Sequence, residues 1–428
     1  MKINYNNDST ENLILFSYEE DNSNSLFKGK LEEILPNLSD GTINLGLGDR
    51  ENLEKDKFQK AIFDLVKYAN KLELKELSFS NENVDFNHSE LVSLIVEAVE
   101  LANYNFDHYK KEKASRVDTL NFKNIESDEK KVSEQLNVLS SQAFARDLVN
   151  LRSNDIYPET LAQRVNEKLS NQGVEVKIYE ENQIRELGLT AYLEVAKGSD
   201  NPPRFIVMEY LKGGENQKPL VFVGKGITYD TGGYSIKSND GMKSMNSDMG
   251  GAGTVIGAMD AISANKLPVN VVAIVAACEN SISGKSYKPG DVIKARNGMT
   301  IEVDNTDAEG RITLADAVNY GVTEYKPEMI IDLATLTGAV LVALGETYTG
   351  AVTNNEEAFE KVQAAAKSSN EKIWQLPNDD FIKSYNNSEV ADIKNSGGRY
   401  GGSITAGQFV GAFVEDTPWV HLDIAGTA

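Results

Sequence analysis

The chain of 428 residues is too long for one ordinary hydrophobic core, so two domains are expected. Its 40% hydrophobic and 8% aromatic residues are typical of a globular protein and exclude general disorder. Because 65 acidic residues outnumber 43 basic ones, the formal net charge is −22, which argues against nucleic acid or an anionic membrane as a partner.

The N-terminal residues 1–21 lack the basic start and apolar stretch of a signal peptide, and no apolar run in the chain reaches bilayer-spanning length. Cys278 is the only cysteine, so no intramolecular disulfide can form, and a cytoplasmic location is predicted. With one cysteine and three histidines, a zinc site of the Cys/His type is disfavoured. Any bound metal is therefore expected to be held mainly by oxygen.

Residues 1–125 alternate short apolar strands with amphipathic helices, a pattern that predicts an N-terminal α/β domain. The sequence predicts strands at 12–18, 42–48 and 76–80, and helices at 56–72 and 89–109. The Gly-Leu-Gly sequence at 46–48 lacks the later glycine of a dinucleotide-binding motif, so it predicts a tight strand-to-helix turn.

Residues 126–157 have the pattern of one long connecting helix, which ends near Pro158. A second, larger α/β domain is predicted over residues 158–428. Its apolar strands are predicted at 204–211, 219–226, 269–278 and 329–338. Their nearly continuous apolar character is typical of a sheet covered on both faces.

Charged residues of this second domain lie beside the predicted strands, where apolar or neutral residues would be ordinary. Lys225 follows a strand that looks buried, and Asp230 and Lys237 come later in the same segment. Glycines 232 and 233 between them allow backbone turns that would bring these charged groups together.

Two further segments contribute charge. Asp248 stands at the start of an apolar helix. Asp307, Glu309 and Arg311 occupy every second position of the sequence DNTDAEGR, just before another helix. If that stretch is extended, the three side chains point the same way, because side chains alternate faces along a strand.

Each of these residues also has an ordinary structural interpretation when taken alone. Asp248 could be a helix N-cap, and Lys225 could be a strand-end lysine that reaches solvent. Asp307 and Glu309 could form a solvated loop face with Arg311 as their ion-pair partner.

Together, the charged residues favour a metal centre. Four carboxylates that converge at loop ends would raise one another's pKa, and two divalent cations would remove that conflict. The charges balance if Lys225 binds as a neutral amine, which requires that a metal displace its proton. Lys237 and Arg311 would then remain as cations facing the substrate, as in a two-metal hydrolytic centre.

The sequence NTDAEGR resembles the signature of the leucyl aminopeptidases, hexameric two-metal exopeptidases of the M17 class. Further segments resemble this family in family order: VGKGITYDTGGYSIK, DMGGAG, DLATLTGA, GGSITAGQFVGAFV and PWVHLDIAGTA. The resemblance covers residues 140–428, and the N-terminal part fits in length and α/β pattern. It implies a small N-terminal α/β domain and a larger catalytic α/β domain, whose central mixed sheet is covered by helices.

The resemblance also assigns roles to the charged residues. Lys225 and Asp248 are expected to ligate one divalent metal and Asp307 the other, with Asp230 and Glu309 bridging both. Manganese or zinc is expected first, with cobalt or magnesium as alternatives, since an oxygen-rich site with one amine does not choose among them.

Two cations and a pocket complete the site that the resemblance implies. Lys237 is expected to lie against the scissile carbonyl oxygen, and Arg311 to hold a bicarbonate ion as general base. The pocket for the first side chain is expected to be lined by Met245, Thr335, Gly338 and Ala425. Peptides with an apolar first residue such as leucine are the expected substrates, and a homohexamer is the expected assembly.

The chain departs from the family mildly at Tyr229 and Thr231, where Phe and Ser are commoner, and more markedly at two other places. Asn246 stands where relatives more often carry Lys or Arg, so a positive charge near Asp248 is expected to be missing. The sequence ends at Ala428, short of the family's usual length, and C-terminal truncation with reduced stability or activity is therefore expected.

Two other functions remain open from the sequence. The chain could be a dipeptidase, for example one that hydrolyses cysteinyl-glycine. It could also be a binding protein that keeps the family scaffold without activity, although every catalytic position named above is present.

Overall fold

The computed structural model describes residues 1–7, 9–21, 26–37 and 39–428. The chain divides into two compact units, Met1–Ala143 and Phe144–Ala428. Helix α3, Glu129–Asn150, contributes residues to both units. It ends earlier than the predicted helix, because a turn closed by the hydrogen bond from Asp155 N to Arg152 O follows it.

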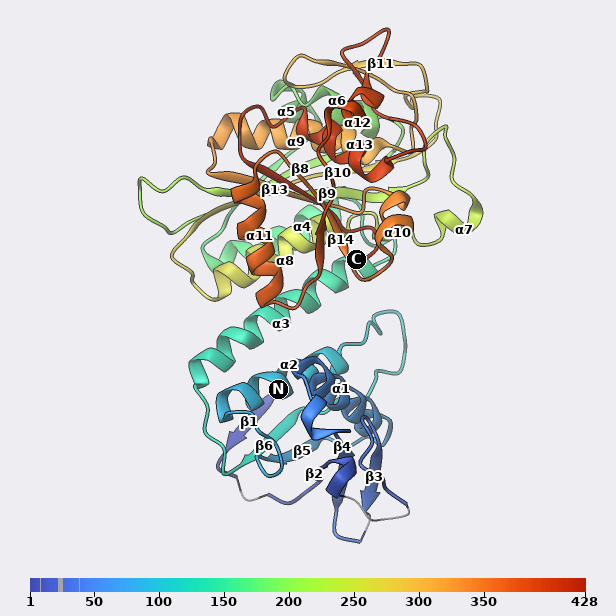
Figure 1. Ribbon diagram of the computed structural model, residues 1–428. Coiled ribbons are helices and arrows are strands. Elements are labelled where there is room, and N and C mark those ends of the chain that lie inside the picture. Colours follow the sequence, from blue (N-terminus) through green and yellow to red (C-terminus); the bar gives the residue numbers. More distant parts are fainter. Residues whose placement is uncertain (8, 22–25, 38) are drawn as a thin grey trace. The chain divides into compact units, whose positions relative to one another are not determined.

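The N-terminal unit is an α/β layer, as predicted (Figure 1). Its six strands pair in the order β1-β6-β5-β2-β4-β3, and all pairs are parallel except β3 with β4. The strands are β1 (Lys2–Tyr5), β2 (Leu13–Ser17), β3 (Ile34–Asn37), β4 (Thr42–Gly46), β5 (Glu76–Ser80) and β6 (Thr119–Lys123). The helices are α1 (Lys55–Lys71), α2 (His88–Asn103) and the short 3₁₀ helices η1 (Glu19–Asp21) and η2 (Arg50–Asn52).

Local sequence explains the boundaries of these elements. Helix α2 begins after Asn87, whose side chain accepts a hydrogen bond from the backbone N–H of Glu90. It ends at Asn103, before the predicted residue 109, because Tyr104 is extended. The predicted turn after β4 is confirmed by Gly48, whose φ of +76° lies in the left-handed region.

The second unit is built on an eight-stranded mixed sheet of order β15-β14-β17-β13-β9-β10-β8-β7. Its strands are β7 (Glu175–Tyr179), β8 (Arg204–Leu211), β9 (Leu220–Asp230), β10 (Asn270–Asn280), β13 (Met329–Ala334), β14 (Thr349–Thr353), β15 (Ile373–Gln375) and β17 (Trp419–Asp423). A separate three-stranded sheet contains β11 (Val292–Lys294), β12 (Thr300–Glu302) and β16 (Ile393–Lys394).

Helices cover both faces of the large sheet, with α4 and α8 on one face and α9 and α13 on the other (Figure 1). The helices are α4 (Pro158–Leu169), α5 (Glu181–Glu186), α6 (Thr190–Ala196), α7 (Asn239–Met242), α8 (Gly250–Ala264), α9 (Glu309–Tyr325), α10 (Gly338–Leu344), α11 (Glu356–Ser368), α12 (Asp380–Lys383) and α13 (Gly402–Gly411). Three 3₁₀ helices, η3 (Ser170–Gln172), η4 (Met245–Ser247) and η5 (Ser384–Asn386), lie between them. The predicted mixed sheet covered by helices is therefore confirmed.

The four central strands β17, β13, β9 and β10 are parallel, so their carboxyl ends meet at one edge of the sheet. They end at Asp423, Ala334, Asp230 and Asn280, respectively. In open α/β sheets, ligands bind beyond the carboxyl ends of such strands. This edge is therefore where the charged residues of the sequence are brought together.

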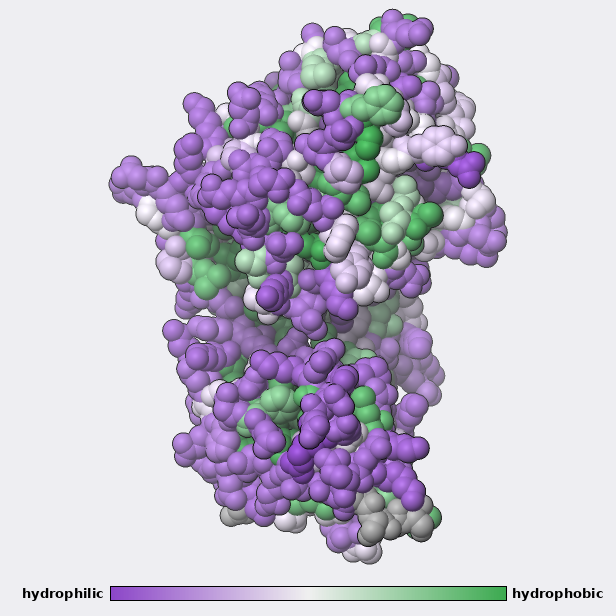
Figure 2. All heavy atoms as spheres, viewed as in Figure 1, coloured by the Kyte–Doolittle hydropathy of each residue, from purple (hydrophilic) through white to green (hydrophobic). Residues whose placement is uncertain are grey.

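The surface agrees with the composition. On the face drawn in Figure 2, hydrophilic residues predominate and hydrophobic residues gather in small groups. Among the described residues, none of the helices combines the length and apolar character needed to cross a bilayer.

Candidate metal centre

Strand β9 carries Lys225 into the interior, where only 4% of the residue is exposed. Its Nζ lies 2.7 Å from Asp248 Oδ2 and 3.1 Å from Glu309 Oε1, and it donates to the backbone oxygen of Thr335 over 3.0 Å. A Cβ at Gly310 would lie 2.3 Å from Lys225 Cε, so a larger residue in the first turn of α9 would displace the Lys225 side chain. The interpretation of Lys225 as a solvent-facing lysine is wrong.

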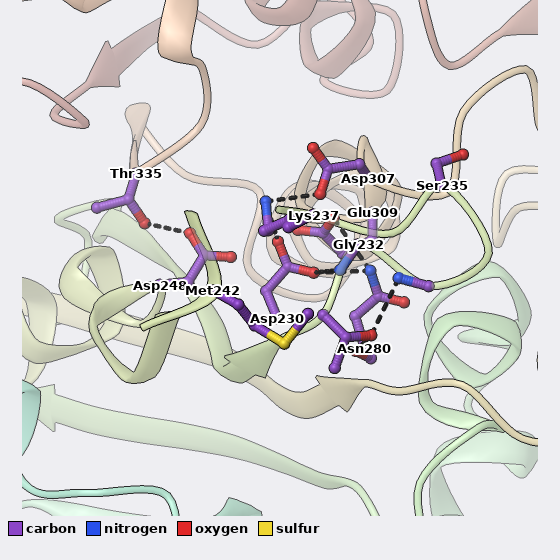
Figure 3. Close-up of polar contacts among 12 residues, drawn as sticks. Asp230, Gly232, Ser235, Lys237, Met242, Asp248, Asn280, Asp307, Glu309 and Thr335 are labelled. Carbon is purple, nitrogen blue, oxygen red and sulfur yellow. Dashed lines mark hydrogen bonds and ion pairs between the residues drawn. The ribbon is translucent and has the colours of Figure 1, made fainter. Parts of the chain in front are cut away.

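A second lysine lies between the other two carboxylates (Figure 3). The Nζ of Lys237 is 2.8 Å from Asp230 Oδ2 and 2.6 Å from Asp307 Oδ1. The chain reaches this position by a turn through Gly232, whose φ is +83° and whose missing Cβ would meet Asp307 Oδ1 at 2.7 Å. The glycine turn thus brings Asp230, Lys237 and Asp307 together, as the sequence predicts.

Asp248 is not the N-cap of helix α8, although it follows the 3₁₀ helix η4 as its C-cap residue. Helix α8 begins at Gly250, and Met249 occupies the N-cap position. The Asp248 side chain points to the cluster instead, where its Oδ1 accepts a hydrogen bond from Thr335 Oγ1 over 2.8 Å (Figure 3). The same oxygen accepts from Lys225 Nζ, also over 2.8 Å.

The alternating residues Asp307, Glu309 and Arg311 do not form a strand. Glu309 begins α9, and residues two apart on a helix lie about 200° apart around its axis. The side chains of Arg311 and Glu309 therefore leave different sides of the helix. Among the described residues, Arg311 forms no ion pair with a carboxylate. It is buried, and its Nε has no hydrogen-bond partner in the part of the chain that the structure describes. The alternative interpretation, a loop face with Arg311 as the ion-pair partner of Asp307 and Glu309, is therefore wrong.

Burial and mutual repulsion shift the acidic pKa values upward, as expected for converging carboxylates. Burial, with repulsion from Asp230, raises the pKa of Glu309 to about 8. Burial also raises the pKa of Asp248 to about 6, although the Lys225 charge opposes it. For Asp307, burial raises the pKa against the opposing effect of Lys237.

Burial and neighbouring charges shift the pKa values of the cluster's three cations in different directions. Burial alone would lower the pKa of Lys225, but the charges of Asp248 and Glu309 outweigh burial and raise it. The pKa of Lys237 is likewise raised by its carboxylates, against the effect of burial. Burial lowers the pKa of Arg311 to about 10, so its guanidinium stays charged at neutral pH.

The donor set fits divalent cations. Asp230, Asp307 and Glu309 each offer a carboxylate oxygen, and these three atoms lie within 4.8 Å of one another. Asp248 and Lys225 add a fourth carboxylate and an amine beside them. Carboxylate oxygens are the ligands that magnesium and manganese prefer, and an amine nitrogen suits zinc or cobalt as well.

The predicted pocket residues lie on segments next to this cluster. Strand β13 ends at Ala334, earlier than predicted, and Thr335 then turns to donate to Asp248. A Cβ on Gly338 would meet no atom within 4 Å, so this position borders open space. Met245 is partly buried in η4, three residues before Asp248.

The sequence did not point to Asp423, which lies at the end of β17 and is 1% exposed. Its Oδ1 accepts from the backbone N–H groups of Leu336 (3.2 Å), Thr337 (3.4 Å) and Ala425 (3.2 Å), and its Oδ2 accepts from Thr337 Oγ1 over 2.6 Å. Asp423 therefore ties the loop that carries Thr335 to the segment that carries Ala425. Its signal in the sequence was an acidic residue at the end of an apolar segment.

Asn246 faces away from the carboxylates. Its Nδ2 donates to the backbone oxygens of Val149 (3.0 Å) and Leu151 (3.1 Å), at the end of α3, and its Oδ1 accepts from Arg152 Nη1 over 3.1 Å. Residue 246 is neutral, as its sequence position indicates, and the guanidinium of Arg152 lies directly against it.

Sequence comparisons match both units. A model described as the cytosol aminopeptidase family, catalytic domain, matches residues 143–428, and one for the N-terminal domain of that family matches residues 20–113. The chain is 44% identical over 419 residues to a probable cytosol aminopeptidase of Clostridium perfringens, covering 94% of this chain and 85% of that protein. A probable cytosol aminopeptidase of Clostridium tetani is 44% identical over 424 residues, covering 97% and 88%.

A solved structure has the same fold. The bottromycin maturation enzyme BotP in complex with Mn superimposes with a TM-score of 0.88 at 28% sequence identity. The match covers 97% of this chain and 92% of that one.

Proposed function

Because the chain belongs to the cytosol aminopeptidase family, we propose that it is a two-metal aminopeptidase that releases apolar N-terminal residues, leucine foremost, from short peptides. Family membership supports a metal-dependent aminopeptidase. One observation carries the two-metal proposal: three carboxylate oxygens lie within 4.8 Å of one another, with a fourth carboxylate and a buried lysine beside them.

In this proposal, Asp230 and Glu309 would be shared by two divalent ions, Lys225 and Asp248 would hold one ion, and Asp307 would hold the other. When bound, the ions would activate a water molecule and polarise the peptide carbonyl. Lys225 must lose its proton to become a ligand, because an ammonium group has no free electron pair. The structure of BotP in complex with Mn supports manganese, with zinc, cobalt and magnesium as alternatives.

The remaining charged groups act on the substrate. Asp248 would pair with the peptide's free α-amine, which positions the first peptide bond and excludes blocked N-termini. Lys237 would donate to the carbonyl oxygen, and this interaction strengthens as negative charge develops there. Arg311, buried and with a free Nε–H among the described residues, would hold a bicarbonate ion, which would supply a general base beside the leaving amine.

The first side chain would occupy a pocket lined by Met245, Thr335, Gly338 and Ala425. The open space at Gly338 leaves room for an apolar side chain such as leucine. A homohexamer and a cytoplasmic location are further parts of this proposal, and both derive from the resemblance and the composition. The domain boundaries at 125 and 157 remain part of the proposal as well.

Turnover of leucine p-nitroanilide tests the proposal. The protein is treated with EDTA, and manganese, zinc, cobalt and magnesium are added back one at a time. We expect loss of activity and recovery with at least one metal, whereas N-acetylated leucine p-nitroanilide stays uncleaved. Failure of every metal to give turnover would contradict the proposal. Faster hydrolysis of cysteinyl-glycine than of leucyl substrates would favour the dipeptidase alternative.

A further inference from the structure

A neutral side chain, Asn280, lies between two of the cluster's carboxylates. It is the last residue of β10, is 0% exposed, and lies opposite Asp230 in the parallel pairing with β9. Its Nδ2 lies 2.8 Å from Asp230 Oδ1 and 3.3 Å from Glu309 Oε2 (Figure 3). The same Nδ2 lies 2.9 Å from the backbone oxygen of Thr306. One amide group thus connects β9, α9 and the loop that precedes α9.

The neighbours of Asn280 determine which way its amide faces. All three partners of Nδ2 are hydrogen-bond acceptors, so the amide oxygen cannot take its place. The Oδ1 is buried and has no hydrogen-bond partner among the described residues, and a Cβ on Gly233 would lie 3.1 Å from it. An unpaired buried oxygen lowers stability. Asn280 therefore donates hydrogen bonds to the carboxylates although its own unpaired oxygen lowers the stability of the fold.

Asn280 and the lysines contact different oxygens of the same carboxylates. Asn280 contacts Asp230 Oδ1 and Glu309 Oε2, whereas Lys237 lies near Asp230 Oδ2 and Lys225 near Glu309 Oε1. A neutral donor can orient two carboxylates without adding a positive charge that would repel a metal cation. An aspartate at this position would add negative charge and lose both N–H donors.

We propose that Asn280 is a positioning residue of the metal centre, which holds the carboxylates of Asp230 and Glu309 in the orientation that binds divalent ions. This inference rests on the proposed function. The backbone oxygen of Asn280 also accepts from Thr231 N (3.0 Å) and Thr231 Oγ1 (2.8 Å). Substitutions that keep the backbone therefore leave the start of the glycine turn supported.

Manganese binding to the full chain, measured by isothermal titration calorimetry, tests the proposal. Asn280→Ala removes the amide and leaves a cavity, whereas Asn280→Leu removes the donors but keeps a similar volume. We expect both variants to bind Mn²⁺ about 10- to 100-fold more weakly than the wild type, the range typical for residues that orient metal ligands. Thermal melting of the EDTA-treated proteins shows whether each variant is folded.

Asn319→Ala is the matched control. Asn319 is 1% exposed in the same unit, accepts from Arg296 Nη1 over 3.0 Å and donates to the backbone oxygen of Phe413 over 3.3 Å. We expect this variant to melt at a lower temperature and to keep wild-type affinity for Mn²⁺.

Three outcomes would overturn the inference. Wild-type affinity in a folded Asn280 variant would overturn it alone, because the carboxylates would then need no amide between them. Equal weakening in Asn319→Ala would also overturn it alone, since lower stability would explain both effects. A wild-type protein that binds no Mn²⁺ would overturn the proposed function and this inference together.

Discussion

The two units of the chain bury different kinds of polar residue around sheets of similar design. Each has a sheet with helices packed on it and an extensive apolar core. Among the described residues, the N-terminal unit buries mostly neutral polar groups, such as Ser78, Asn103 and Asn121. The second unit buries full charges on its central strands, including Lys225 within β9 and Asp230 at the end of that strand. The difference teaches that the architecture alone does not indicate function, whereas buried charge does.

Neutral polar groups in the N-terminal sheet satisfy one another. Asn4 Nδ2 donates to Asn121 Oδ1 over 2.8 Å, and Asn121 Nδ2 donates to Ser78 Oγ over 3.5 Å. In the second unit, four carboxylates share two lysines, which leaves an excess of negative charge. We therefore expect substitutions in the first network to change stability, and substitutions in the second to change metal binding and turnover.

Among these substitutions, Glu309→Gln in the second unit should reduce turnover the most. It keeps the shape of a proposed bridging ligand but removes its charge, so kcat/KM should fall about 10³-fold or more, the equivalent of several kcal/mol. The melting temperature of the EDTA-treated protein should change little, because burial already raises the pKa of Glu309 to about 8. Wild-type turnover of this variant would locate catalysis elsewhere.

Metal affinity should depend strongly on pH. The pKa of Lys225 is raised by its carboxylate neighbours, and that of Glu309 is about 8, so metal ions must displace protons near neutral pH. Competition with protons weakens binding at low pH, so Mn²⁺ affinity should rise at least about tenfold per pH unit from about pH 6 to 8. Calorimetric titrations across this range provide the check. A flat profile would show that Lys225 is not a ligand.

Asp423→Asn should have a smaller effect on activity, and this effect should concern the choice of substrate by the proposed pocket. Loss of charged hydrogen bonds to Leu336, Thr337 and Ala425 should lower the free energy of unfolding by about 2–3 kcal/mol. The preference for leucine over alanine p-nitroanilide should fall about tenfold as the pocket walls loosen.

Asp332→Asn is the control for Asp423. Asp332 is fully buried in the same sheet, where Trp419 Nε1 and His421 Nδ1 each lie 2.6 Å from its carboxylate. A similar loss of stability without loss of selectivity is expected. If both variants lose selectivity equally, Asp423 has no particular role in the pocket.

Asn121→Ala should have the smallest effect. Because Asn121 is 2% exposed and hydrogen bonded within the N-terminal sheet, its loss should reduce the free energy of unfolding by about 1 kcal/mol. Turnover and Mn²⁺ affinity should stay at wild-type values. A marked drop in metal affinity would erase the contrast between the two units.

Periodicity predicted most strands and helices, because apolar residues at fixed spacing are a local property of the sequence. The extended conformation considered for residues 304–311 is not found, since alternating charges suit a strand as well as the first turn of a helix. Asp248 could equally have been a cap until Lys225 and Thr335 were seen beside it.

The roles of Asn280 and Asp423 could not be predicted from the sequence for a different reason. An amide or a carboxylate at the end of an apolar strand is ordinary in a sequence. Its role depends on which strands are neighbours, and that ordering is a long-range property of the fold.

Anomalous scattering from crystals of the full chain soaked in manganese tests the central claim most directly. We predict two peaks, both within ligand distance of Asp230 and Glu309, one also near Lys225 and Asp248 and the other near Asp307. The absence of both peaks at these side chains, with manganese in ample excess, would contradict the account.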